Sequence, residues 1–107
     1  MTTPEATARI KIDAALGDAG WIVQDLGDLN LHAGCGVAVR EFPLAGQDHA
    51  DYLLYVNGKA IGIVEAKAVG STLTGVELQA ARYSQGLPAG VPAYVRPLPF
   101  LYQTTGV

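Results

Sequence analysis

Apolar residues recur at helical spacing near the start of the chain, which predicts a helix there. The apolar stripe consists of Ala8, Ile12, Ala15 and Leu16. Thr3 followed by Pro4 is typical of a helix start, with a capping residue and a proline at the first helical position. Gly17 and Gly20 mark the end of the helix. The stretch 21–23 is expected to pack under it.

Five later apolar runs are expected to form strands: 37–42, 51–56, 60–67, 93–96 and 100–103. Between the second and third runs lies Asn57-Gly58, a sequence typical of a tight hairpin turn. The capping-box sequence at 74–77 predicts a second helix that runs to about Ser84. The order is helix, three strands, helix, two strands. It indicates an α/β domain with a mixed central sheet of about five strands flanked by helices.

The register of the hairpin decides whether two carboxylates meet at one end of it. A strict two-residue turn makes Asp51 face Val64 and puts Glu65 on the opposite face. One extra residue pairs Asp51 with Glu65 instead, because side chains alternate along a strand. We predict a bulge, with Gly58 or Gly62 as the extra residue, since glycine tolerates the required backbone angles.

Two carboxylates brought together repel each other unless a cation joins them. Mg²⁺ is a natural cation for Asp51 and Glu65, with the Ala66 backbone carbonyl as a third ligand. Such a metal lowers the pKa of a bound water and stabilises charge on a phosphate. Lys67 shares a face with Glu65 in either register. It would orient or deprotonate the water, or stabilise the developing charge, and the sequence leaves these roles open.

The same residues also have a purely structural interpretation. Asp51 would then cap the start of a strand, while Glu65 and Lys67 would form a solvated charge pair. Glu65 follows the almost wholly apolar run 60–64, so it lies at the end of a strand that is expected to be buried rather than exposed. This position, together with the acid at the matching end of the preceding strand, leaves the metal site and the structural interpretation equally open.

Pairs of polar residues lie four apart on both predicted helices. Gln79 and Tyr83 share a face of the second helix, where their amide and hydroxyl can reach a phosphate or hold a metal ligand. An ordinary amphipathic helix is the alternative. Glu5 and Arg9 are expected to form an exposed ion pair on the first helix. Glu41 is expected to be structural.

Composition fits one compact domain of 107 residues, half of them hydrophobic. A net charge of −3 argues against a simple electrostatic nucleic-acid binder. Another domain or subunit is expected to supply many of the contacts that bind DNA. Solvated surface is the expected setting of Lys59, Arg82 and Arg96, and contact with DNA phosphates is the alternative. No apolar run approaches the roughly 18 residues that span a bilayer. Cys35 is the only cysteine, which fits a reducing cytoplasm and a buried thiol.

Together these residues resemble the PD-(D/E)xK nuclease superfamily, and more closely the N-terminal nuclease domain of type I restriction enzyme R (motor) subunits. The resembling segments are 36–44, 50–56, 63–67, 79–83, 99–102 and 104–106. Among them, Ile63-Val64-Glu65-Ala66-Lys67 carries the Glu-x-Lys element, and Gln79-Ala80-Ala81-Arg82-Tyr83 resembles the family's Q-x-x-x-Y motif. Ala50 stands where the superfamily name has proline, which contributes no ligand.

The resemblance implies a PD-(D/E)xK (restriction endonuclease-like) core. Asp51 and Glu65 become metal ligands, Lys67 the catalytic lysine, and Gln79 and Tyr83 auxiliary catalytic or DNA-contacting residues. It further implies Mg²⁺-dependent endonucleolytic cleavage of double-stranded DNA, with Mn²⁺ as a substitute. Cleavage would follow ATP-driven translocation, in a complex with modification and specificity subunits.

No G-x-x-x-x-G-K-[ST] motif occurs in these residues. ATP use would therefore belong to a helicase or translocase region of a longer chain, of which 1–107 would be an N-terminal endonuclease fragment. Two other functions fit the same residues. One is a stand-alone nuclease of the same fold, such as a resolvase or repair enzyme. The other is a non-catalytic α/β docking module, in which Asp51 and Glu65 do not converge and no divalent metal binds.

Overall fold

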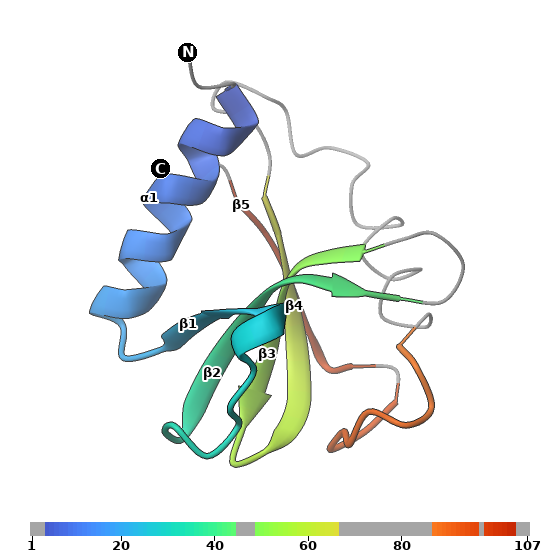
Figure 1. Ribbon diagram of the computed structural model, residues 1–107. Coiled ribbons are helices and arrows are strands. Elements are labelled where there is room, and N and C mark those ends of the chain that lie inside the picture. Colours follow the sequence, from blue (N-terminus) through green and yellow to red (C-terminus); the bar gives the residue numbers. More distant parts are fainter. Residues whose placement is uncertain (1–3, 45–48, 67–86, 97, 105–107) are drawn as a thin grey trace.

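The computed structural model describes residues 4–44, 49–66, 87–96 and 98–104 (Figure 1). The elements are α1 (Pro4–Asp18), β1 (Ile22–Asp25), the 3-10 helix η1 (Leu26–Asp28), β2 (Gly36–Pro43), β3 (His49–Val56), β4 (Lys59–Ala66) and β5 (Phe100–Thr104). The five strands form one sheet in chain order. The two outer pairs, β1 with β2 and β4 with β5, are parallel, and the inner pairs are antiparallel. The predicted α/β fold with a mixed sheet is confirmed.

The end of α1 follows the prediction closely. Gly20 has a φ of 99°, a left-handed angle that glycine adopts without strain. The Trp21 N–H donates to the Leu16 carbonyl over 2.9 Å, and the Gly20 N–H donates to the Gly17 carbonyl over 3.0 Å. This pair of bonds satisfies carbonyl groups that the helix end leaves open. Leu16 and Trp21 both pack against the same hydrophobic cluster.

The strand predicted at 93–96 was wrong. Only Ala93 takes part in an isolated bridge, with Ala60 of β4. Beyond it, Arg96 turns back and donates to the carbonyl oxygens of Leu87 and Pro88 over 3.0 Å each. The segment 87–96 is therefore folded on itself and does not extend along the sheet. Arg96 is an organiser of this loop, a role that the sequence did not indicate.

The sheet gains its fifth strand at the other edge, where β1 pairs with β2. We expected residues 21–23 to pack under the helix. Strand β1 has four residues and a single buried position, so its sequence carries no clear alternation. The second predicted helix, 74–84, lies outside the described residues.

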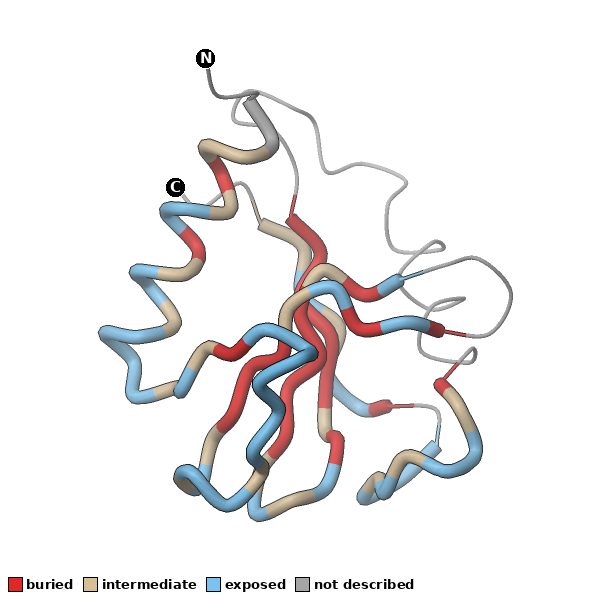
Figure 2. Tube along the Cα trace, viewed as in Figure 1, coloured by how far each residue is buried: buried red, intermediate tan, exposed pale blue. Residues whose placement is uncertain are grey.

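Hydrophobic clusters lie on both faces of the sheet, and Figure 2 shows buried residues concentrated along β2, β3 and β4. The helix-side cluster contains Ile12, Ala38, Tyr52, Leu54, Val64 and Ala66. The opposite cluster contains Val37, Val39, Phe42, Leu44, Ala50, Leu53, Tyr55, Ala60, Ile63, Leu87 and Leu98. Because the central strands are covered on both faces, they read as continuous apolar runs in the sequence.

Within the described ranges, no helix has the length and apolar character needed to cross a bilayer.

Gly62 lets β5 lie close to β4. A Cβ atom at Gly62 would come within 2.8 Å of the Phe100 carbonyl oxygen and 2.9 Å of the Phe100 Cβ. Both distances are shorter than non-bonded atoms tolerate, and the first atom belongs to the backbone. Any side chain at this position therefore has to displace the edge strand.

Gly62→Ala is expected to lower the free energy of unfolding by about 2 kcal/mol, because the added methyl group overpacks the contact with β5. Urea denaturation measures this change. Gly17→Ala is the matched control: no heavy atom lies within 4 Å of the added Cβ. In a helix this change is expected to stabilise by about 0.5–1 kcal/mol. Equal effects of the two substitutions would contradict the packing argument.

Candidate functional site

The hairpin turn between β3 and β4 has the expected form. Asn57 has a φ of 50° and Gly58 a φ of 82°. Two successive left-handed residues are the mark of the two-residue turn whose twist matches that of the flanking strands. Val56 pairs with Lys59 across this turn. Gly58 thus serves the turn and is not the extra residue of a bulge.

A bulge follows in β4, as predicted. Tyr55 pairs with Ala60, whereas Leu54 pairs with Gly62. Ile61 is therefore the extra residue, one position before the glycine that we expected. The prediction of a bulge is confirmed, and its assignment to Gly58 or Gly62 was wrong. Glycine was favoured for backbone freedom, but Gly62 is needed for the close contact with β5.

The bulge sets the register at the far end of the hairpin. Tyr52 pairs with Val64, and the same register continued by one residue places Asp51 opposite Glu65. Asp51 Oδ2 accepts a hydrogen bond from the Ala66 backbone N–H over 2.8 Å. Glu65 is only 4% exposed. The two acidic residues are thus cross-strand neighbours, and their roles as metal ligands stay a prediction.

Arg9 of α1 reaches across to these strand ends. Its guanidinium pairs with Asp51 Oδ1 through Nη2 and with Glu41 Oε1 through Nη1. The sequence did not predict either contact. The expected pair of Arg9 with Glu5 is untested, since the Glu5 side chain lies outside the described structure. Glu41, expected to be structural, carries an ion pair with the helix.

The backbone of β2 turns Glu41 towards the helix. Its φ of 53° is left-handed, which is uncommon for a residue with a side chain. Side chains of a regular strand point alternately to the two faces of the sheet, so residues three apart lie on opposite faces. Val39 and Phe42 are three apart and yet lie in the same cluster, so this alternation is broken at Glu41. Neighbouring Arg40 and Glu41 therefore both contact residues of α1.

A second polar network ties α1 to the sheet beside Arg9. Arg40 donates to both oxygens of Asp13, over 3.3 and 3.0 Å, and to Asp25 Oδ1 over 2.9 Å. Tyr52 donates its hydroxyl proton to Asp13 Oδ1 over 2.6 Å. The hydrogen bond to Asp13 is the main cause that raises the pKa of Arg40. Burial, followed by the bond to Asp13, raises the pKa of Tyr52 above the ordinary range.

Both networks border a small cavity of about 200 Å³. The cavity is lined by Ala6, Arg9, Ile10, Asp13, Arg40, Glu41, Asp51 and Tyr52. Arg9 and Asp13 are one helical turn apart, so they point to the same side of α1. That spacing was the available sequence signal for this site, because it flanks the apolar stripe that faces the sheet.

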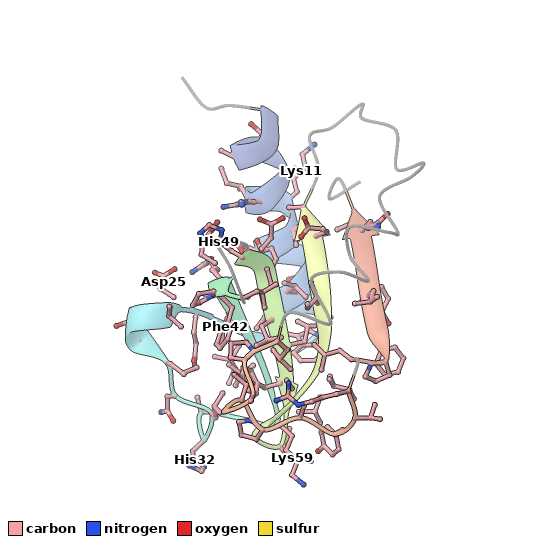
Figure 3. All side chains as sticks on the ribbon, turned by 90° about the vertical axis from the view of Figure 1, so that its right-hand side faces the viewer. Lys11, Asp25, His32, Phe42, His49 and Lys59 are labelled. Carbon is pink, nitrogen blue, oxygen red and sulfur yellow. The ribbon has the colours of Figure 1, made fainter. Side chains whose placement is uncertain are left out.

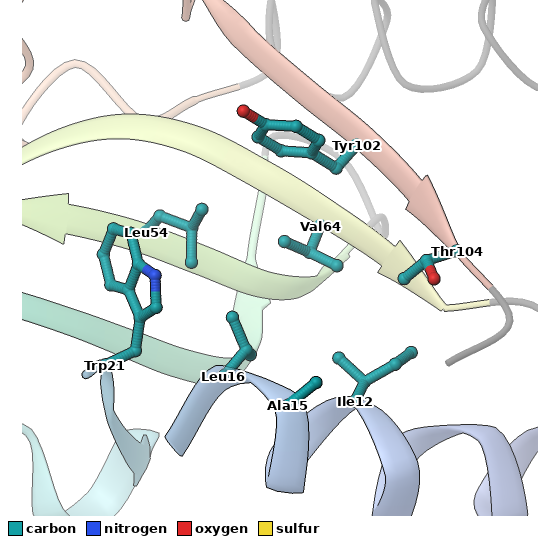
Figure 4. A pocket seen from close by; sticks show the side chains of 8 residues that line it. All are labelled: Ile12, Ala15, Leu16, Trp21, Leu54, Val64, Tyr102 and Thr104. Atoms are coloured by element: carbon teal, nitrogen blue, oxygen red, sulfur yellow. The ribbon is translucent and has the colours of Figure 1, made fainter. Parts of the chain in front are cut away.

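A larger, apolar pocket of about 440 Å³ lies between α1 and the sheet (Figure 4). It is lined by Ile12, Ala15, Leu16, Trp21, Leu54, Val64, Tyr102 and Thr104. No carboxylate, histidine, lysine or arginine is among these lining residues. Its chemistry suits apolar contact rather than hydrolysis, so the candidate site is the polar end of the sheet.

Four of the candidate residues, Lys67, Gln79, Arg82 and Tyr83, lie outside the described residues. Within the part of the chain that is described, no group of three or more His, Cys, Asp and Glu side chains is arranged to hold a metal ion. Any metal centre here therefore also needs backbone oxygens, water or residues outside that part.

The expectation of a buried Cys35 was wrong. Cys35 is exposed and lies directly before β2. Its carbonyl accepts a hydrogen bond from the Asn57 N–H over 2.8 Å. The backbone of Cys35 is thus anchored beside the hairpin turn while its side chain stays at the surface.

Comparison with protein families matches residues 29–96 to the type I restriction enzyme EcoKI endonuclease subunit second domain. More than half of the chain is covered by the match. The chain belongs to this family. Neither the curated proteins nor the solved structures compared with it include a match.

Membership in the type I restriction endonuclease subunit family confirms the coarser part of the resemblance, a region of the restriction enzyme R subunit. The matched range contains Asp51 and Glu65, together with the three positions 67, 79 and 83. Arg9 lies outside it. The helix contact to Asp51 is therefore a feature of the structure that the family match does not include.

The Tyr52 hydroxyl predicts a loss of stability at alkaline pH. Folding raises the pKa of Tyr52 above the ordinary value of 10.0, so the unfolded chain releases this proton first as pH rises. The free energy of unfolding is expected to fall above about pH 10, by up to about 1.4 kcal/mol per pH unit for this group. Urea denaturation at a series of pH values measures the slope.

Tyr52→Phe is expected to show a shallower slope above pH 10, because it removes the titrating hydroxyl. At neutral pH it is expected to be less stable by about 1 kcal/mol through loss of the bond to Asp13. Tyr55, whose pKa is also raised by burial, is present in both proteins and contributes equally. An unchanged alkaline slope in the variant would show that Tyr52 does not hold its proton as described.

Proposed function

We propose that this chain is a PD-(D/E)xK nuclease domain of a type I restriction enzyme R subunit, and that it cleaves double-stranded DNA with Mg²⁺. The observation that carries the proposal is the β4 bulge at Ile61, which places Asp51 opposite Glu65. Membership in a restriction endonuclease subunit family supports the nuclease class.

The donor set fits a hard divalent cation. Asp51 and Glu65 supply carboxylate oxygens, and the Ala66 carbonyl would supply a backbone oxygen; these are the ligand types that Mg²⁺ takes. Glu65 is almost fully buried, so a cation bound there would be largely shielded from solvent. A bound Mg²⁺ would supply an acidified water and stabilise charge on the scissile phosphate.

The chain's own residues would position the reacting groups. The Ala66 N–H holds Asp51 Oδ2 and so fixes the carboxylate against the end of β4. Lys67 follows Glu65 by two residues, a spacing that puts both on one face of an extended strand. We assign to Lys67 the role of orienting or deprotonating the attacking water, or of stabilising the charge that develops on the phosphate. Gln79 and Tyr83 would make auxiliary contacts with the phosphate or with the metal ligands.

Other parts of the enzyme would supply DNA binding and ATP use. A chain with a net charge of −3 neutralises few phosphates by itself. The modification and specificity subunits, and a helicase region of a longer chain, would hold and move the DNA in a cytoplasmic complex. The nuclease domain would then act on DNA that is delivered to it.

Variants test the catalytic assignment in the assembled restriction complex. Asp51→Asn, Glu65→Gln and Lys67→Ala are each expected to keep DNA binding and to lose Mg²⁺-dependent cleavage by about 100-fold or more. Asp28→Asn is the matched control, because it removes one negative charge at an exposed position of η1. Cleavage at the normal rate by Lys67→Ala would overturn the assignment.

Crystals soaked with Mn²⁺ test the metal site directly. An anomalous peak is expected about 2.0–2.3 Å from both Asp51 and Glu65, the range for hard-cation coordination. Carboxylates that point to opposite faces of the hairpin, with no peak between them, would contradict the nuclease proposal and favour a docking module.

A further inference from the structure

We infer that Arg9 is the resident counter-ion of the acidic strand ends, and that its guanidinium shifts from Asp51 towards Glu41 when a divalent cation binds. The inference rests on the proposed function, because it requires a metal at Asp51. It assigns a role to a residue of α1 outside the family match. Arg9 would be a positioning residue that tunes metal affinity, and not a catalytic one.

Both oxygens of Asp51 are already engaged. Oδ1 pairs with Arg9 Nη2, and Oδ2 accepts from the Ala66 N–H. A divalent cation that binds Asp51 would have to share this carboxylate with a guanidinium. Two cations on one carboxylate repel each other strongly at such short range, all the more where solvent is partly excluded. Metal binding and the Arg9–Asp51 pair therefore compete.

Glu41 is an alternative ion-pair partner for the displaced guanidinium. Arg9 Nη1 already pairs with Glu41 Oε1, so a small rotation keeps one partner while releasing the other. The Glu41 side chain is 47% exposed and that of Asp51 only 13%. Water therefore screens Glu41, whereas Asp51 depends more on a nearby cation for compensation. The metal and the guanidinium can then each take one carboxylate.

The backbone supports this arrangement. Glu41 keeps a left-handed φ of 53°, a conformation that costs a residue with a side chain free energy. In return its carboxylate faces α1 and meets Arg9. With Asp51 and Glu65, it makes three acidic residues on three adjacent strands, β2, β3 and β4. A positive charge at this end reduces their mutual repulsion before any metal is present.

The main competing role for Arg9 is a fixed support that holds Asp51 ready for the metal. The two roles differ in the sign of one measurement. Removing a competing charge tightens metal binding, whereas removing a support loosens it. Because binding of the metal alone is measured, DNA, ATP and cleavage do not enter the result.

Mn²⁺ titration of the full chain, followed by calorimetry and by the electron paramagnetic resonance of free Mn²⁺, tests the inference. Arg9→Gln is expected to bind Mn²⁺ roughly threefold to tenfold more tightly than wild type, as expected for loss of a partly exposed charge pair. Lys59→Gln is the matched control. It removes the same charge at the opposite end of the sheet from His49, as Figure 3 shows, and is expected to bind as wild type does.

The role of Glu41 is separated by a double-mutant cycle. Glu41→Gln is expected to weaken Mn²⁺ binding in the wild-type background, because the guanidinium then loses a carboxylate that can hold it away from Asp51. In the Arg9→Gln background the same change is expected to have much less effect. An equal effect in both backgrounds would overturn the exchange between the two carboxylates.

The failures are distinguishable. If wild type binds Mn²⁺ and Arg9→Gln binds it equally or more weakly, the inference fails and the metal site stands. If Mn²⁺ binding survives Asp51→Asn, or is absent in wild type and Arg9→Gln alike, the proposed function fails as well. Thermal unfolding checks that each variant folds. Should Arg9→Gln not fold, Arg9→Met replaces it, because it removes the same charge and keeps a long, unbranched side chain; unchanged or weaker binding by it overturns the inference.

Discussion

The extra residue in β4 governs which side chains meet at the end of the hairpin. Up to Ala60 the pairing follows the tight turn, and from Gly62 onward it is shifted by one. Hydrophobic burial alone does not choose between these registers, because β3 and β4 are covered by apolar clusters on both faces. Contact between Gly62 and Phe100 of β5 helps to fix the shifted register. Packing at one edge of the sheet thus contributes to the choice of neighbours for Asp51.

Helix α1 is joined to the sheet by apolar and ionic contacts together. Ile12 lies in the helix-side cluster, while Arg9 and Asp13 carry the polar contacts one helical turn apart. Asp13 binds Arg40 and Tyr52, and Arg9 binds Glu41 and Asp51. The helix therefore covers the core and also sets the charge around the candidate site.

Local sequence signals predicted the elements whose structure depends on neighbouring residues. Proline at the start and glycine at the end defined α1, and Asn57-Gly58 defined the hairpin. Two segments whose structure depends on contacts outside them were predicted wrongly. Strand β1 exists only because it lies parallel to β2, and 93–96 is prevented from extending by the bonds of Arg96 to its own loop.

The candidate site could be predicted only in part for the same reason. A bulge was needed for Asp51 to meet Glu65, and the sequence showed that need, but glycine was a poor guide to its position at Ile61. Nothing local indicated that Arg9 would have partners on β2 and β3. The roles of Lys67, Gln79 and Tyr83 stay predictions that rest on the resemblance.

The left-handed backbone of Glu41 carries a consequence for engineering. Redesign for thermostability would favour glycine or asparagine at this position, since either tolerates a φ of 53° better than glutamate does. Such a change would relieve backbone strain and would also remove the carboxylate that meets Arg9. Backbone stability therefore favours glycine or asparagine here, whereas the ion pair with Arg9 requires glutamate. Such a trade-off is typical of strained positions beside functional sites.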